Sequence, residues 1–77
     1  MRTEERAVFT FPTTTDAMHM EYLCGKRNLP GRMIPVPTSI SAGCGLAWSA
    51  PPASREAAQK AAREGGVRVE AVTMLVL

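Results

Sequence analysis

A chain of 77 residues has room for one domain, which we expect to span residues 1–77 with a folded core at about 7–72. Its hydrophobic content of 45% is typical of a globular domain and argues against a disordered chain. Nine basic and seven acidic residues give a net charge of +2, and the basic residues do not cluster, so no nucleic-acid partner is expected.

The ends of the chain carry no recognisable targeting or membrane signal. The N-terminal residues 1–6 are charged and lack the apolar core of a signal peptide. The apolar run at residues 71–77 is interrupted by Thr73 and is too short to cross a bilayer. We therefore expect a cytoplasmic protein with no membrane partner.

Cysteine and histidine are too sparse to suggest a metal site. The chain holds two cysteines and one histidine, and none of them forms a pair with recognised ligand spacing. Two cysteines do not make a disulfide framework either, and in the cytoplasm they would stay reduced. We expect no metal and no cofactor.

The first third of the chain predicts a strand followed by a helix. Residues 7–11 are of the β type, and a proline ends them. Thr13 is a candidate N-cap, with Asp16 three positions later in an arrangement like a capping box. A helix is predicted over residues 15–27 because one apolar stripe runs along it. The stripe consists of Ala17, Met20, Leu23 and Cys24.

The middle of the chain predicts two strands joined by a loop. Residues 32–36 favour a strand, but Pro35 has no N–H to donate, which indicates a sheet edge or a bulge. Residues 37–44 are small and turn-forming, as in a loop. Residues 45–49 predict the third strand.

The last third predicts a second helix and a fourth strand. The helix begins near Ser54 and ends near residue 64, before two glycines that stop it. Its inner face should consist of Ala57, Ala58, Ala61 and Ala62. Residues 67–72 alternate as a strand that continues into residues 73–77.

The order β-α-β-β-α-β predicts an α+β protein with the ferredoxin-like plan. The sheet would have four antiparallel strands, with both helices on one face. The fourth strand is expected at a sheet edge, where its exposed backbone groups and apolar end would permit a homodimer.

Cys44 is the candidate reactive residue of the chain. The loop that holds it should lie at the same end of the sheet as Thr13 and Thr14, which begin the first helix. Unpaired N–H groups there would stabilise a thiolate and lower the cysteine pKa. Gly43 and Gly45 would permit positive φ and leave the sulfur open to a partner. The alternative is a small, buried and inert cysteine.

The prolines and glycines around Cys44 also carry a family resemblance. The motif residues are 10–14, then Ile-Pro-Val-Pro at 34–37, then Ile-Ser-Ala-Gly-Cys-Gly-Leu-Ala at 40–47. With these residues the chain resembles the family of small selenium/sulfur carrier-like proteins over about residues 7–72. The resemblance implies that Cys44 carries a persulfide or a selenide. Pro35, Pro37 and Ser41, with the two glycines, would support its loop.

One position departs from the family pattern. Members often have a basic residue after the second proline, and Thr38 stands there in this chain. Any stabilisation of a carried anion by that charge would be missing.

The other reactive side chains have simpler interpretations. Cys24 lies on the apolar stripe, ~15 Å from the start of its helix, so it is expected in the core and not in a disulfide with Cys44. His19 should face solvent, with a role in proton transfer as the alternative. Trp48 is expected to pack in the core.

Two functions remain open from the sequence. In the first, Cys44 receives sulfur or selenium from a cysteine-desulfurase-like protein donor and passes it to a protein acceptor. In the second, the domain is a non-enzymatic binding or regulatory module in which Cys44 is structural. A free-standing enzyme is less favoured, because no histidine–carboxylate pair is positioned to serve Cys44 as a nucleophile.

Overall fold

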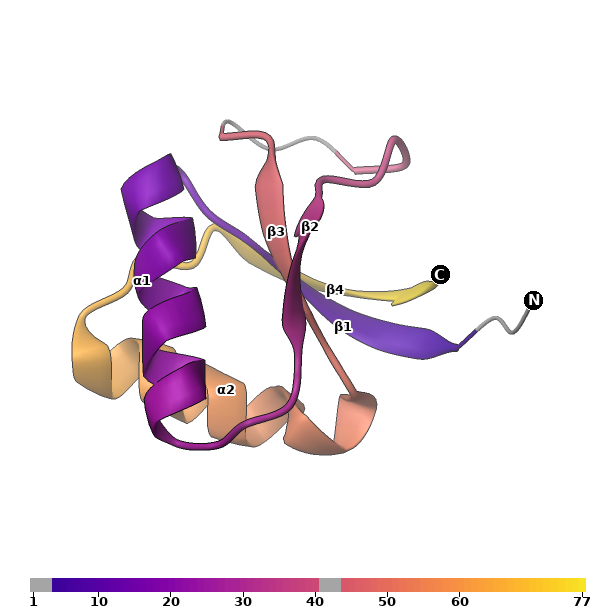
Figure 1. The fold of residues 1–77 in the computed structure, drawn as a ribbon. Helices are drawn as coiled ribbons and strands as arrows, with labels where there is room; N and C mark the ends of the chain where they lie inside the picture. The colour runs from indigo at the N-terminus through magenta and orange to yellow at the C-terminus, as the bar shows by residue number, and fades with distance from the viewer. Residues whose placement is uncertain (1–3, 41–43) are drawn as a thin grey trace.

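The order of helices and strands follows the pattern of the sequence (Figure 1). The computed structural model describes residues 4–40 and 44–77. The strands are β1 (Glu5–Thr10), β2 (Arg32–Pro35), β3 (Leu46–Ala50) and β4 (Ala71–Val76). The helices are α1 (Thr14–Lys26) and α2 (Arg55–Gly65), and a short 3-10 turn, η1 (Pro52–Ser54), precedes α2.

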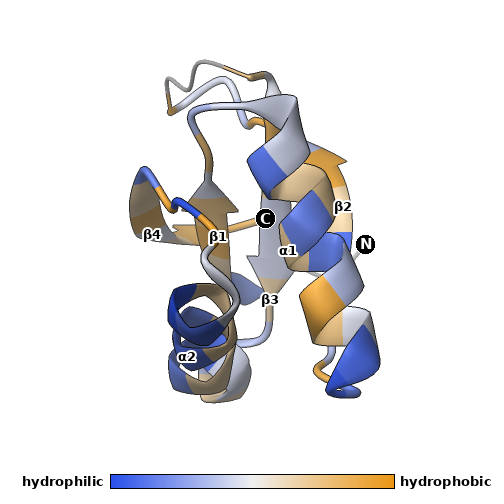
Figure 2. Cartoon of the chain, turned by 90° about the vertical axis from the view of Figure 1, so that its left-hand side faces the viewer, coloured by the Kyte–Doolittle hydropathy of each residue, from blue (hydrophilic) through white to orange (hydrophobic). Residues whose placement is uncertain are grey.

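The four strands form one sheet in the order β2-β3-β1-β4. Each neighbouring pair is antiparallel. Both helices pack on the same face of the sheet, and in Figure 2 the outward side of α2 is hydrophilic. This arrangement is the predicted α+β, ferredoxin-like plan. The order also confirms that β2, which ends in Pro35, and β4 are the edge strands.

The pairing register divides the sheet residues between two faces. Phe9 lies opposite Trp48, and Trp48 lies opposite Met33, so these three side chains share the face that the helices cover. Phe9 and Trp48 belong to one apolar core with Met20 and Cys24 of α1, and Met33 packs against that core. The alternate residues of the central strands, such as Val8 and Ser49, point to the opposite face.

The fourth strand begins at Ala71 and not at residue 67 as predicted. Gly66 takes a left-handed conformation (φ 76°) at the end of α2, and the N–H of Val67 still bonds to a carbonyl of that helix. The next N–H, that of Arg68, bonds to Asp16. The chain first meets β1 at Glu70, whose N–H donates to the carbonyl oxygen of Thr10 at 2.7 Å. Val67 and Arg68 belong to the alternating run, but their N–H groups bond outside the sheet.

The inner face of α2 is narrower than the sequence predicted. Ala58, Ala61 and Ala62 are buried, whereas Ala57 is exposed. Ala57 precedes Ala58 by one position, about 100° around the helix, and so falls outside the stripe that faces the sheet.

Candidate functional site

β2 and β3 form an antiparallel hairpin, and Cys44 lies in the connecting segment, two residues before β3. Pro35 is paired with Leu46 in the ladder. Beyond that pair, the N–H of Val36 donates to the carbonyl oxygen of Gly45 at 3.0 Å. Gly45 has φ 78°, and a side chain there would meet open space. The positive φ therefore explains why a glycine stands at position 45, as the sequence suggested.

The thiol of Cys44 is half-buried and turned toward its own strand. Its Sγ lies 3.3 Å from the carbonyl oxygen of Leu46 and 3.5 Å from the N–H nitrogen of the same residue. The side chain also packs against the edge of the core. Thiol hydrogen bonds are weak, so they place little restraint on the sulfur. Gly43 and Ser41, two of the predicted supports of this loop, lie outside the described residues.

The start of α1 lies at the same end of the sheet as the Cys44 loop (Figure 1). Thr13 is the N-cap, as predicted: its Oγ1 accepts a hydrogen bond from the N–H of Asp16 at 3.2 Å. The same hydroxyl donates to Asp16 Oδ2 at 2.6 Å. The hydroxyl of Thr13 is thus engaged within the cap. A role of Thr13 and Thr14 in stabilising a Cys44 thiolate stays a prediction.

The carboxylate of Asp16 already places a negative charge at this helix start. The hydrogen bond from Thr13 lowers the pKa of Asp16, and the contacts with Arg68 lower it further, while desolvation partly opposes them. A carboxylate is favoured here by the same helix dipole that would favour a thiolate. A thiolate on Cys44 that approached this helix start would therefore meet a charge that Arg68 partly compensates.

Cys24 is confirmed as a core residue. Its side chain has no exposed surface and lies in the cluster that contains Phe9 and Met20. Burial raises the pKa of its thiol, with a smaller opposing effect from Arg27. The two cysteines therefore differ in access, because Cys44 is half-buried and Cys24 is enclosed.

His19 and Trp48 also lie where the sequence placed them. His19 is exposed on α1. Trp48 is 4% exposed and forms part of the core, which confirms its packing role.

Two further features are absent from residues 4–40 and 44–77. Groups of three or more histidine, cysteine or acidic side chains that could hold a metal ion are absent there. No helix in that part of the chain is both long and apolar enough to cross a membrane.

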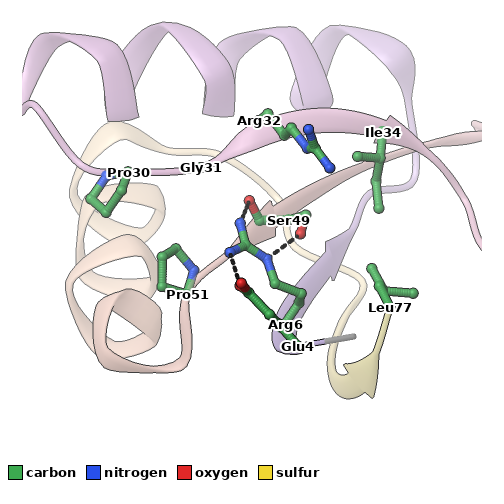
Figure 3. Close-up of a pocket in the computed structure, with 9 residues that line it drawn as sticks. All are labelled: Glu4, Arg6, Pro30, Gly31, Arg32, Ile34, Ser49, Pro51 and Leu77. Atoms are coloured by element: carbon green, nitrogen blue, oxygen red, sulfur yellow. Dashed lines mark hydrogen bonds and ion pairs between the residues drawn. The ribbon is translucent and has the colours of Figure 1, made fainter. Parts of the chain in front are cut away.

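The sequence analysis missed a groove that Arg6 and Arg32 help to line (Figure 3). The sequence did contain a signal. Arg6 directly precedes one predicted strand and Arg32 begins another, and both stand at alternate positions whose side chains point away from the helices. That signal is weak, because charged residues at strand ends are ordinary surface features.

Comparison with known proteins bears on the carrier hypothesis. A family model matches residues 6–73, which include both helices, β2, β3, most of β1, the first half of β4 and the Cys44 hairpin. The chain belongs to the family described as "Putative Se/S carrier protein-like". No curated protein and no solved structure matches the chain. The resemblance seen in the sequence is thus confirmed, and the name of this Se/S carrier-like family points to sulfur or selenium as the cargo.

Proposed function

We propose that this protein is a small carrier that holds sulfur or selenium on Cys44 and relays it from a donor enzyme to an acceptor. Membership of the Se/S carrier-like family is the observation on which the proposal chiefly rests. The difference between the two cysteines supports the choice of residue. Cys44 lies half-buried beside the left-handed Gly45, whereas Cys24 is enclosed by the core.

The proposed transfer is a pair of thiol–disulfide-type exchanges. The Cys44 thiolate attacks the terminal sulfur of a persulfide on the donor. A new S–S bond forms on Cys44, the S–S bond of the donor breaks, and the donor leaves as a thiolate. An acceptor nucleophile then attacks the terminal atom, and Cys44 returns to the thiolate. No external oxidant or reductant is consumed, and a selenium atom in the terminal position follows the same course.

The hairpin suits such a carrier for mechanical reasons. Pro35 and Pro37 stiffen the chain where it leaves β2, because a proline ring fixes φ. Gly45, which follows Cys44, carries no side chain, and a Cβ there would meet open space. A carrier must be reached by two different proteins in turn, so an exposed loop on a rigid sheet is a suitable place for the cargo.

The alternative is a binding or regulatory module in which Cys44 is structural. The contacts of its Sγ with the backbone of Leu46 and with the core edge favour this second function. It differs from the carrier proposal in one testable respect: a structural Cys44 would receive no sulfur from a donor.

Mass spectrometry after incubation with a cysteine desulfurase and cysteine tests the proposal. We expect the intact protein to gain the mass of one sulfur atom, and peptide mapping to place that sulfur on Cys44. The gain should vanish on treatment with a reductant, because a persulfide is reducible.

Two matched variants identify the acceptor residue. Cys44→Ser should abolish the gain in mass, and Cys24→Ser should retain it. An adduct that survives in Cys44→Ser, or no adduct under conditions in which the desulfurase loads another thiol, would contradict the carrier function.

A further inference from the structure

A groove of about 610 Å³ lies on the side of the sheet away from the helices. Ser49 is paired with Arg32 across β2 and β3, and their side chains share the face opposite Trp48. Arg6 reaches over the same face to Ser49 (Figure 3). A volume of this size is in the range of small-molecule sites. The groove lies apart from the Cys44 side chain, which is not among its lining residues.

Arg6 is held in the groove in a fixed orientation. Its Nε donates to Ser49 Oγ at 2.9 Å, and its Nη2 donates to the carbonyl oxygen of Ser49 at 3.2 Å. Its Nη1 lies 3.8 Å from Glu4 Oε2. The side chain of Arg6 is only 20% exposed. A guanidinium so restrained has already lost most of its conformational freedom, so a ligand that it binds need not order it again.

Arg32 adds a second positive charge to the same wall. Among residues 4–40 and 44–77, Arg32 forms no ion pair. The side chains that line the groove include two guanidinium groups, those of Arg6 and Arg32, and one carboxylate, that of Glu4. Arg32 is exposed, so its guanidinium is open to an anionic ligand at the groove.

The remainder of the lining is mostly apolar. It consists of Pro30, Gly31, Ile34, Pro51 and Leu77. Figure 3 shows Ile34 and Leu77 on one side of the two arginines and the prolines on the other. A ligand that fills the groove would thus meet charge in the middle and aliphatic surface beside it.

We propose that this groove binds a small aliphatic monocarboxylate. The carboxylate would lie between the guanidinium groups of Arg6 and Arg32, which match its two oxygens in charge and geometry. The aliphatic chain would lie against Ile34 and Leu77. This site is independent of the role of Cys44.

A purely structural role explains one arginine but not both. The bonds of Arg6 to Ser49 tie β1 to β3 and would do so with no ligand. Arg32 contributes nothing to that tie. Substitution of Arg32 therefore separates a binding site from a structural clamp.

Titration of the full, isotope-labelled chain with sodium hexanoate, followed by nuclear magnetic resonance at constant ionic strength, tests the proposal. We expect saturable shifts at the amide of Ser49 and at the side-chain Nε–H of Arg6. Acetate should bind at least about fivefold more weakly, because each buried methylene contributes up to about fourfold in affinity. Inorganic phosphate should bind more weakly than hexanoate, since it has no apolar part.

The decisive comparison uses two variants that each lose one positive charge. Arg32→Ala should weaken hexanoate binding by about tenfold or more, because it removes a charge-assisted hydrogen bond. Arg63→Ala, on the exposed side of α2, should leave affinity within about twofold, as for any distant screened charge. The amide spectrum of each variant shows whether it is folded.

Three results would overturn the proposal. Shifts no larger than those caused by sodium chloride would mean that the groove binds no carboxylate. Equal losses of hexanoate affinity in Arg32→Ala and Arg63→Ala would show that binding depends only on the net charge of the protein. Phosphate binding as tight as hexanoate binding would remove the aliphatic chain from the definition of the ligand.

Discussion

Arg68 binds the carboxylate of Asp16 twice, through its backbone N–H at 3.2 Å and through its guanidinium Nη2 at 3.1 Å. These contacts join the segment after α2 to the first turn of α1, across 52 positions of sequence. The guanidinium is largely exposed, so its ion pair adds little by itself. The backbone hydrogen bond matters more. The N–H of Arg68 lies between α2 and β4 and so has no partner in either element, and Asp16 supplies its acceptor.

The carboxylate of Asp16 should make stability depend on acid pH. Its pKa in the folded chain is below the ordinary 3.8, chiefly because Thr13 donates to it. A lowered pKa adds stability above the ordinary value, and that stability is lost as the pH falls through the folded value. We therefore expect Asp16→Asn to lower the free energy of unfolding at neutral pH, and the difference to shrink below pH 3.8. Urea unfolding across that range measures it.

The control for Asp16 is Glu56→Gln, which removes an exposed carboxylate from the first turn of α2. That variant should differ little from the original chain throughout the same pH range. A difference for Asp16→Asn that stays constant from neutral to strongly acid pH would contradict the assigned role of the carboxylate.

The cap of α1 predicts a cost for loss of the Thr13 hydroxyl. Thr13→Ala removes the acceptor for the N–H of Asp16 and the donor to its carboxylate. We expect a loss of about 1 kcal/mol in the free energy of unfolding at neutral pH, as for other N-caps. Thr15→Ala, exposed in the first turn of the same helix, is the control and should change stability far less. Equal effects of the two variants would argue against the cap.

Gly31 and Trp48 make a close backbone approach that a methyl group should disrupt. A Cβ on Gly31 would lie 2.7 Å from three atoms of the Trp48 indole, and φ there is 152°. Gly31→Ala should therefore cost about 1–3 kcal/mol, the usual penalty of overpacking. Gly25→Ala is the control, because a Cβ there meets open space near the end of α1. It should be neutral or stabilise by up to about 1 kcal/mol.

Thermal unfolding followed by Trp48 fluorescence compares the two glycine variants. Gly31→Ala should also alter the fluorescence of the native state, since the indole itself must move. Unchanged fluorescence together with unchanged stability would show that the structure accommodates the added methyl group without a loss of stability.

The two cysteines should differ in reactivity. With a limiting amount of iodoacetamide, Cys44 should be alkylated first, because Cys24 is fully enclosed and its thiol pKa is raised by burial. Peptide mapping by mass spectrometry gives the ratio. The ratio should approach one in urea, where both thiols are exposed. Equal labelling in the folded chain, or faster labelling of Cys24, would count against Cys44 as the residue that carries the cargo.

Local patterns in the sequence were sufficient for the element order, the Thr13 cap and the burial of Cys24. Each depends on residues within one or two turns of each other, where spacing and propensity decide. The start of β4 was not predictable in this way, because Arg68 bonds to a side chain 52 positions away. The groove was missed for the same reason: Arg6 and Ser49 are 43 positions apart, and their contact exists only after the sheet forms.

The exposed edge of β4 predicts a homodimer. β4 pairs with β1 on one side and lies at the end of the sheet order, and its six residues carry no charge and no proline to discourage pairing. Val76 is 68% exposed. Antiparallel pairing of two β4 strands would supply their free backbone groups with partners. It would also gain roughly 25 cal/mol for each Å² of apolar surface covered. The Cys44 loops, next to the opposite edge, would stay open.

Light scattering at high micromolar concentration tests the dimer, with a point substitution as the probe. A chain that ends at Thr73 is unsuitable, because Met74 and Leu75 pair with Ala7 and Arg6 within the same molecule.

Val76→Lys leaves the internal ladder intact, and it places a lysine opposite Glu5, so the monomer should fold while the edge repels a second copy. Met18→Lys makes the same change at an exposed apolar site on α1 and should leave the dimer intact. A monomeric original chain would contradict the dimer. Equal dissociation in both variants would show that the interface does not depend on the edge of β4.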